Sequence, residues 1–269
     1  MATAALIWLV TLIVAGMFAA GRWWFPEPIS AHARAFDSSF ALTLWVTGAI
    51  FFAAQFVLGW AIWRHRKSST PVPNPGNEKL EIFWTAAALV LFVGIAAAST
   101  SIWSGVHLDP VAANAIRIEA AGKQFAFNFR YPGKDGKFGR TDIKLINDAT
   151  GNPFGLDDKD PAARDDIATA ALRVPAGRPV VLLLKSRDVI HNFFVRELRL
   201  KQDLVPGMEI PLAFTADKPG TYSIACSELC GLGHHQMQSS LIVLEPEAFD
   251  KWLDDAHAEL QIVTNAEAR

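Results

Sequence analysis

The hydrophobic positions are concentrated in the first 106 residues, in three stretches without Asp, Glu, Lys or Arg. These stretches cover residues 1–21, 40–63 and 82–106. At about 20–25 residues each, they are long enough for a helix to cross a hydrocarbon core of about 30 Å. Tryptophans lie near the ends of the second and third stretches, where amphipathic rings prefer the membrane boundary. The pattern therefore predicts a transmembrane helical hairpin within residues 38–106.

The first stretch, residues 1–21, allows two interpretations. Ala19, Ala20 and Gly21 provide the small residues of a signal-peptide cleavage site. However, the positively charged segment that normally precedes the apolar core of a signal is missing. We therefore expect a retained third transmembrane helix, and a cleaved secretory signal is the alternative.

The charges between the second and third stretches predict the orientation in the membrane. Arg64, Arg66, Lys67 and Lys79 make this connection basic. Because short loops rich in Lys and Arg remain in the cytoplasm, the chain after residue 106 should lie on the outer side.

From about residue 109 the pattern changes to short apolar runs separated by polar residues and Pro-Gly pairs. Residues 124–131 alternate strictly, with aromatic side chains at every second position, which is the period of a half-buried strand. Further runs cover residues 179–184, 189–195, 210–214, 221–226 and 239–244. Several short strands with turn signals are typical of a sandwich or barrel. We expect a β domain over residues 110–246.

Two segments depart from the strand pattern. Residues 144–166 form a polar, acidic loop. Residues 248–260 have apolar side chains at helical spacing, which predicts an amphipathic helix within a C-terminal segment of residues 247–269. The predicted fold class is thus a membrane-anchored α+β chain, with N-terminal helices followed by the β domain.

The composition excludes several classes of protein. Hydrophobic residues make up 51% of the chain and there are only two cysteines, which excludes a disordered chain and a disulfide-rich scaffold. Lys and Arg number 25 against 27 for Asp and Glu, so there is no basic excess for binding nucleic acid.

Both cysteines lie within residues 226–237, together with two histidines and a methionine. A disulfide would suit an oxidising compartment, but it leaves His234 and Met237 unexplained. Zinc accepts thiolates and imidazoles but has no use for a thioether, whereas this combination of donors selects copper. The cluster therefore predicts a copper site.

The second thiolate indicates two metal ions, because a mononuclear electron-transfer copper uses one thiolate and two imidazoles. Two sulfur atoms can bridge two ions, each capped by an imidazole. The second imidazole must then come from a neighbouring strand, and His191 in the run 189–195 is the remaining candidate. A histidine in an apolar strand is more often a core residue. His235 is expected to face solvent or to lie behind the ligands.

These residues resemble subunit 2 of the heme-copper oxidases, the cytochrome c oxidase subunit that holds the CuA centre. The family pattern Cys-x-Glu-x-Cys-Gly-x-x-His-x-x-Met fits residues 226–237, and an upstream Asp-Val-x-His fits residues 188–191. Residues 201–207 and 76–85 also resemble segments of the family. The resemblance covers residues 75–245.

The resemblance implies a cupredoxin-like Greek-key β-barrel that carries a binuclear copper centre. The sulfur atoms of Cys226 and Cys230 would bridge the two coppers. His191 and His234 would cap the pair, and Met237 would be a weak ligand.

It also implies roles for three more residues. The backbone carbonyl of Glu228 would complete the copper ligands, and its side chain would reach a magnesium (Mg) ion shared with subunit 1. Glu81 matches a family glutamate near the mouth of a proton channel, with an ordinary interfacial carboxylate as the alternative. Phe125 lies where many relatives carry the tryptophan at which electrons arrive.

The function implied by the resemblance is that of the electron-accepting subunit of a terminal oxidase. The copper centre would take electrons from cytochrome c and pass them to the heme of subunit 1, where dioxygen is reduced to water and protons are pumped. Subunit 3 is a further expected partner, and the implied location is a bacterial inner membrane with the copper domain on the periplasmic side.

Two alternative functions remain open, and so does the role of the acidic loop. One alternative function is the copper subunit of a related nitric oxide reductase, because the chemistry that separates the two enzymes resides in the partner subunit. A membrane-anchored copper carrier would need exposed ligands for a single copper. The acidic residues 157–166 either attract a basic cytochrome or form a solvated insertion, and we favour the insertion.

Overall fold

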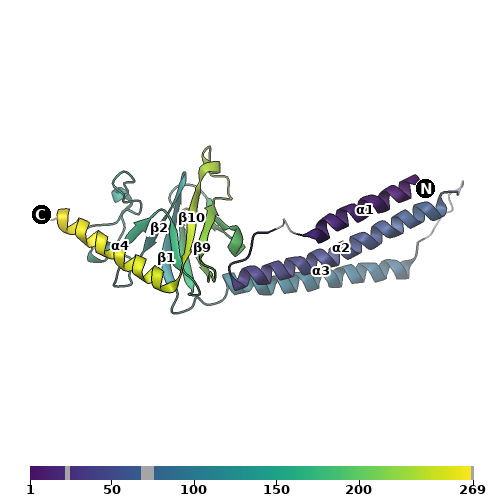
Figure 1. Ribbon diagram of the computed structural model, residues 1–269, viewed down its shortest axis with the longest axis horizontal. Helices are drawn as coiled ribbons and strands as arrows, with labels where there is room; N and C mark the ends of the chain where they lie inside the picture. Colours follow the sequence, from purple (N-terminus) through teal and green to yellow (C-terminus); the bar gives the residue numbers. More distant parts are fainter. Residues whose placement is uncertain (22–24, 68–75, 268–269) are drawn as a thin grey trace. The chain divides into compact units, whose positions relative to one another are not determined.

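The computed structural model describes residues 1–21, 25–67 and 76–267, with side chains described up to residue 260 (Figure 1). The chain forms two compact units. One comprises residues 1–26 and 35–103, and the other comprises residues 27–34 and the chain from Ser104 onward.

The first unit is built from three helices, α1 (Ala2–Ala20), α2 (Ala31–His65) and α3 (Glu78–His107). Each is long and apolar enough to cross a membrane, and the described residues contain three such helices. A helix satisfies its own backbone hydrogen bonds, which lipid cannot do. Helices α2 and α3 extend past the charge-free stretches, because polar residues add further turns at their ends, whereas α1 ends within its stretch.

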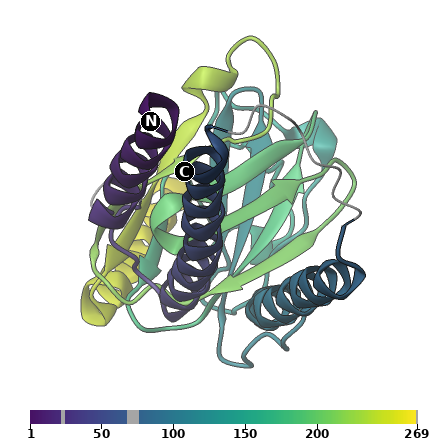
Figure 2. The ribbon, with the colours of Figure 1, turned by 90° about the vertical axis from the view of Figure 1, so that its right-hand side faces the viewer.

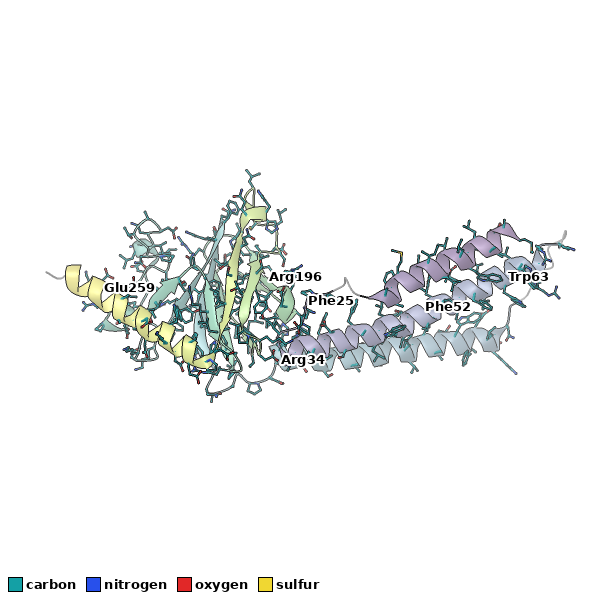
Figure 3. The ribbon with its side chains drawn as sticks, in the orientation of Figure 1. Phe25, Arg34, Phe52, Trp63, Arg196 and Glu259 are labelled. Carbon is teal, nitrogen blue, oxygen red and sulfur yellow. The ribbon has the colours of Figure 1, made fainter. Side chains whose placement is uncertain are left out.

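Helix α1 contacts α2 through aromatic side chains. The ring of Trp8 stacks on Phe56 with 5.6 Å between ring centroids, and Trp8 Nε1 donates to the Phe56 carbonyl at 3.3 Å. Gly59 permits this approach, since a Cβ there would lie 2.3 Å from Trp8 Nε1. Other apolar side chains of α2, such as Phe52 and Trp63, are exposed (Figure 3). Lipid or another membrane subunit would cover them.

The second unit contains two five-stranded sheets (Figure 2). The first sheet has the order β3-β2-β1-β5-β8. Its strands are β1 (Ile116–Lys123), β2 (Ala126–Tyr131), β3 (Ile167–Thr169), β5 (Val180–Ser186) and β8 (Ile210–Phe214). The second sheet has the order β4-β10-β9-β6-β7. Its strands are β4 (Leu172–Pro175), β6 (His191–Val195), β7 (Leu200–Leu204), β9 (Gly220–Ala225) and β10 (Gln238–Leu244). Strand β1 pairs with β5, and β10 with β4, in parallel.

The expected strand over residues 124–131 is wrong at its start. Lys123 pairs with Ala126 in the β1–β2 hairpin, so Gln124 and Phe125 form its two-residue turn. The later aromatic residues of β2 are buried in the core between the sheets. The sequence also did not predict β1, β3, β4 and β7, because each is short or carries charged and polar side chains.

The C-terminal helix α4 (Pro246–Glu267) is longer than the helix expected over residues 248–260. Phe249 on this helix is 1% exposed and belongs to the core of the β domain, and Trp252 packs against that core. The apolar stripe thus covers the sandwich, as an amphipathic helix should.

The segment before α2 also belongs to the β domain. Ile29 is 2% exposed and lies in the core. Its N–H donates to the Glu197 carbonyl at 3.1 Å, and its carbonyl accepts from the N–H of Asp217 at 2.8 Å. Residues 27–34 are therefore a structural part of this domain.

The acidic loop is an ordered insertion between β2 and β3. An antiparallel bridge between Thr141 and Leu156 closes it. Two of its carboxylates are paired: Asp157 pairs with Arg140 at 2.7 Å, and Asp166 is 1% exposed and pairs with Arg130 of β2. Asp166 thus anchors the insertion to the first sheet.

Candidate metal centre

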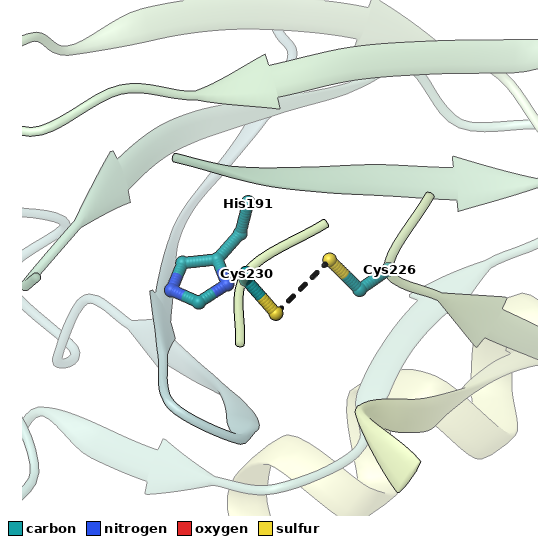
Figure 4. Close-up of side chains that lie close together, drawn as sticks. All are labelled: His191, Cys226 and Cys230. Atoms are coloured by element: carbon teal, nitrogen blue, oxygen red, sulfur yellow. Dashed lines mark hydrogen bonds between the residues drawn. The ribbon is translucent and has the colours of Figure 1, made fainter. Parts of the chain in front are cut away.

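Neighbouring strands of the second sheet bring the sequence-predicted ligands together. His191 is the first residue of β6, and Cys226 follows β9 directly, and these strands pair through Phe194 and Ala225. Cys230 lies in the loop that leads to β10. His191, Cys226 and Cys230 are buried, and their ligand atoms all lie within 4.8 Å of one another (Figure 4).

The remaining donors lie around the two thiols. The sulfur atoms of Cys226 and Cys230 are 3.9 Å apart, and both cysteines are free. His234 Nδ1 lies 3.5 Å and Met237 Sδ 3.8 Å from Cys230 Sγ. The backbone carbonyl of Glu228 accepts from Cys226 Sγ at 3.2 Å, while the Glu228 side chain is exposed. The backbone and side-chain donors thus converge on the sulfur pair.

The imidazole of His191 is held in place by Asp188. Its Nε2 bonds to Asp188 Oδ1 at 2.7 Å, and the side chain is fully buried. Its Nδ1 is buried and has no hydrogen-bond partner among the described residues. Buried polar atoms are nearly always satisfied. An unpartnered imidazole nitrogen beside two thiols, with its other nitrogen on a carboxylate, fits a metal ligand.

The electrostatics of the site agree with this fit. Burial, together with the neighbouring Cys226, raises the pKa of the Cys230 thiol to about 11. Burial also acts to raise the pKa of Asp188, but hydrogen bonds from the Gln124 N–H and from His191 outweigh it and hold that pKa below its usual value. The charged Asp188 favours a proton on His191 Nε2, which leaves Nδ1 as the donor atom. A soft cation would replace the thiol protons.

The ring of Phe125, in the β1–β2 turn, packs against the loop that carries the candidate ligands. A Cβ at Gly233 would lie 2.4 Å from the Phe125 ring, and one at Gly231 would lie 3.2 Å from it. The Phe125 ring can therefore pack this closely against the loop only because residues 231 and 233 are glycines, which have no side chain. Phe125 is 36% exposed, so its ring joins the ligand loop to the surface.

The other predicted residues do not join this cluster. His235 is exposed, as expected. Glu81 is exposed in the first turn of α3, which belongs to the first unit.

Residues that support the ligands were not predicted from the sequence. Asn192 is 1% exposed; its side chain donates to Asp203 Oδ1 and accepts from Ser227 Oγ, both at 2.6 Å. Ser227 follows Cys226, so this chain ties the ligand loop to β6 and β7. The one sequence signal was the position of Asn192 and Ser227 directly beside ligands.

Comparisons with known proteins place the chain in a family. The family model described as cytochrome c oxidase subunit II, periplasmic domain, matches residues 116–245. The alternative cytochrome c oxidase subunit 2 of Bradyrhizobium diazoefficiens is 34% identical over 254 residues, which cover 93% of this chain and 90% of the relative. The chain belongs to the cytochrome c oxidase subunit 2 family. The cytochrome c oxidase subunit 2 of Synechocystis is 31% identical over 271 residues, covering 92% of this chain and 80% of the relative.

One of the similar solved structures is of a periplasmic domain. The periplasmic domain of subunit II of the Bradyrhizobium japonicum cytochrome oxidase aligns with 56% of this chain and 99% of that chain, at 25% identity and a TM-score of 0.41. Membership of this family and the structure together confirm the expected order of apolar N-terminal helices followed by a cupredoxin-like β domain.

Proposed function

We propose that this chain is the copper-bearing subunit of a heme-copper terminal oxidase. It would accept electrons from cytochrome c or another small donor outside the membrane and pass them to the heme of subunit 1. The observation that carries the proposal is the cluster of Cys226, Cys230 and the buried, unpartnered Nδ1 of His191 in a chain of this family.

The donor set supports a binuclear copper centre. Cys226, Cys230, His191 and His234 would hold the ions, and Met237 would be a weak ligand whose thioether zinc does not use. When bound, such a centre supplies one-electron redox chemistry. The protein's part is to bury the thiols, to exclude water and to orient the imidazole of His191 through Asp188.

Other family roles are proposed for residues at the edge of the site and in the membrane. The Glu228 carbonyl would complete the copper ligands, and its exposed side chain would reach a magnesium ion shared with subunit 1. Phe125 would receive electrons, since its ring joins the ligand loop to the surface. Glu81 would lie at the mouth of a proton channel, and its exposure in the first turn of α3 is compatible with that role.

We propose that the protein lies in a bacterial inner membrane with its β domain in the periplasm. Because residues 27–34 belong to the β domain, the end of α1 and the start of α2 should lie on the same side of the membrane as that domain. The basic residues that follow α2 then remain in the cytoplasm. The contact of Trp8 with Phe56 supports a retained α1.

Purification of the intact complex through a tag on this chain tests the proposal. A heme-bearing subunit 1 should copurify, subunit 3 is expected with it, and metal analysis should give two coppers per chain. Reduced cytochrome c should then drive dioxygen consumption. Nitric oxide consumption in place of dioxygen consumption would favour a related nitric oxide reductase. A chain with one exchangeable copper and no heme partner would be a copper carrier and would contradict the proposal.

A further inference from the structure

Gln124 contacts both segments that carry the candidate ligands. It lies in the turn of the β1–β2 hairpin, in the first sheet. Its backbone N–H donates to Asp188 Oδ2 at 2.7 Å, and its side-chain Nε2 donates to the Cys230 carbonyl at 2.6 Å. Asp188 precedes β6, and Cys230 lies between β9 and β10, so one residue of the first sheet joins two segments of the second.

These bonds extend to a ligand on each side. The second oxygen of Asp188 bonds to His191 Nε2 at 2.7 Å. A continuous chain of hydrogen bonds therefore runs from His191 through Asp188 and Gln124 to Cys230. Two of its bonds involve a carboxylate that is held in its charged form, and such bonds are stronger than neutral ones.

The same turn holds the aromatic ring on the ligand loop. A Cβ at Gly231 would lie 2.8 Å from Gln124 Nε2 and 3.2 Å from the Phe125 ring. Both side chains of the turn therefore reach the loop at one glycine. The amide donates to the carbonyl that precedes this glycine, and the ring packs directly on it.

We propose that Gln124 is a positioning residue of the metal centre, whose side-chain amide fixes the Cys230 backbone relative to His191 and seats Phe125 on the ligand loop. The inference rests on the proposed copper function, but the hydrogen bonds that carry it belong to the metal-free protein. Without the amide, the Cys230 carbonyl loses its donor, and the loop from Cys230 to His234 is free to shift away from His191.

The test compares Gln124→Met with Gln238→Met in the full chain. Methionine keeps the length of the Gln124 side chain and its contact with the loop but cannot donate to Cys230, and the backbone N–H to Asp188 remains. Gln238 is exposed at the start of β10, directly after Met237, and provides a matched control. Gln124→Glu is a second variant, because it keeps the shape and replaces the donor with an acceptor that repels the carbonyl.

The first readout needs no metal. Cys226 and Cys230 are 8% and 4% exposed, so their alkylation depends on opening of the loop. We expect Gln124→Met to speed alkylation of the metal-free protein by on the order of 5-fold, the equivalent of one lost hydrogen bond. Gln238→Met should react at the wild-type rate.

The second readout uses copper. The Gln124 variants should keep two coppers per chain but show an altered hyperfine pattern in paramagnetic resonance and faster release of copper to a chelator. The positioning role of Gln124 is refuted if both Gln124 variants match the wild type in alkylation rate, paramagnetic resonance spectrum and rate of copper release. Unfolding of the β domain in both variants would also overturn it, because Gln124 would then support the fold and not the site. If the wild type binds a single copper, the proposed function fails, while the alkylation result still decides the role of Gln124.

Discussion

Replacing Arg130 with methionine should destabilise the β domain strongly. Arg130 is 1% exposed on β2, and it binds Glu119 across the strand pair at 2.8 Å and Asp166 of the insertion at 2.9 Å. Both carboxylates are themselves buried, at 6% and 1% exposure. Methionine keeps the apolar stem but leaves two buried negative charges without their common cation.

The structure sets the size of the effect. Removing one partner of a buried ion pair costs about 3–5 kcal/mol, a large share of a total stability of about 5–15 kcal/mol. Glu119 keeps a second cation, Lys185, at 2.5 Å. Asp166 keeps the N–H groups of Gly133 and Gly139 at 3.1 and 2.9 Å. We therefore expect the lower end of the range, about 3 kcal/mol.

Urea unfolding of the full chain in detergent, followed by tryptophan fluorescence, measures this loss. Arg140→Met is the matched control, because Arg140 pairs with Asp157 in the same insertion but its side chain is 66% exposed. That exposed pair should contribute less than about 1 kcal/mol. Adding Asp166→Asn to Arg130→Met should restore part of the stability, since an amide carries no charge. An Arg130→Met loss no larger than the control's would refute the reasoning.

Further predictions concern the docking residue, the N-terminal segment and the insertion. Phe125→Ala should slow reduction by cytochrome c by on the order of 30-fold, as for an aromatic contact worth about 2 kcal/mol, with copper content unchanged. Unaltered stopped-flow rates would remove Phe125 from this role. Ile29→Ala should lower the free energy of unfolding of the β domain by about 2–5 kcal/mol, because it empties a buried site; a neutral result in urea titration would show that residues 27–34 do not contribute to the core. The hydrogen bond from Lys123, with help from Arg187, holds the pKa of Asp148 below its usual value. The charged Asp148 therefore stabilises the insertion above about pH 4, and protection of the insertion from an acid protease should fall as the pH drops below this, a step that Asp148→Asn should lack.

From the sequence, an element could be predicted when its own residues show that it is buried. A membrane helix can be recognised from its own apolar residues, and β5 begins with an unbroken apolar run over residues 180–184. Strand β1 was not predicted because it carries Glu119, whose burial is compensated by Arg130 and Lys185 of the neighbouring strands. The alternating pattern of β2 continued into the turn at Phe125, because an exposed ring and a buried ring look alike in sequence.

The same limit applies to the site. The ligand spacing between Cys226 and Met237 is local, so both thiols and their neighbours could be found from the sequence. His191 required a second, distant strand, and it was found because the chemistry needs another imidazole. Gln124 and Asn192 could not be found in this way, since each acts through hydrogen bonds to segments far away in the chain. The roles of Glu81 and Phe125 stay predictions.

Paramagnetic resonance of the oxidised, copper-loaded complex tests the central idea most directly. We expect one unpaired electron shared equally by two copper nuclei across the sulfur atoms of Cys226 and Cys230, and loss of this signal in Cys230→Ser. A signal from a single copper nucleus in the wild-type complex, or a signal that Cys230→Ser leaves unchanged, would contradict it.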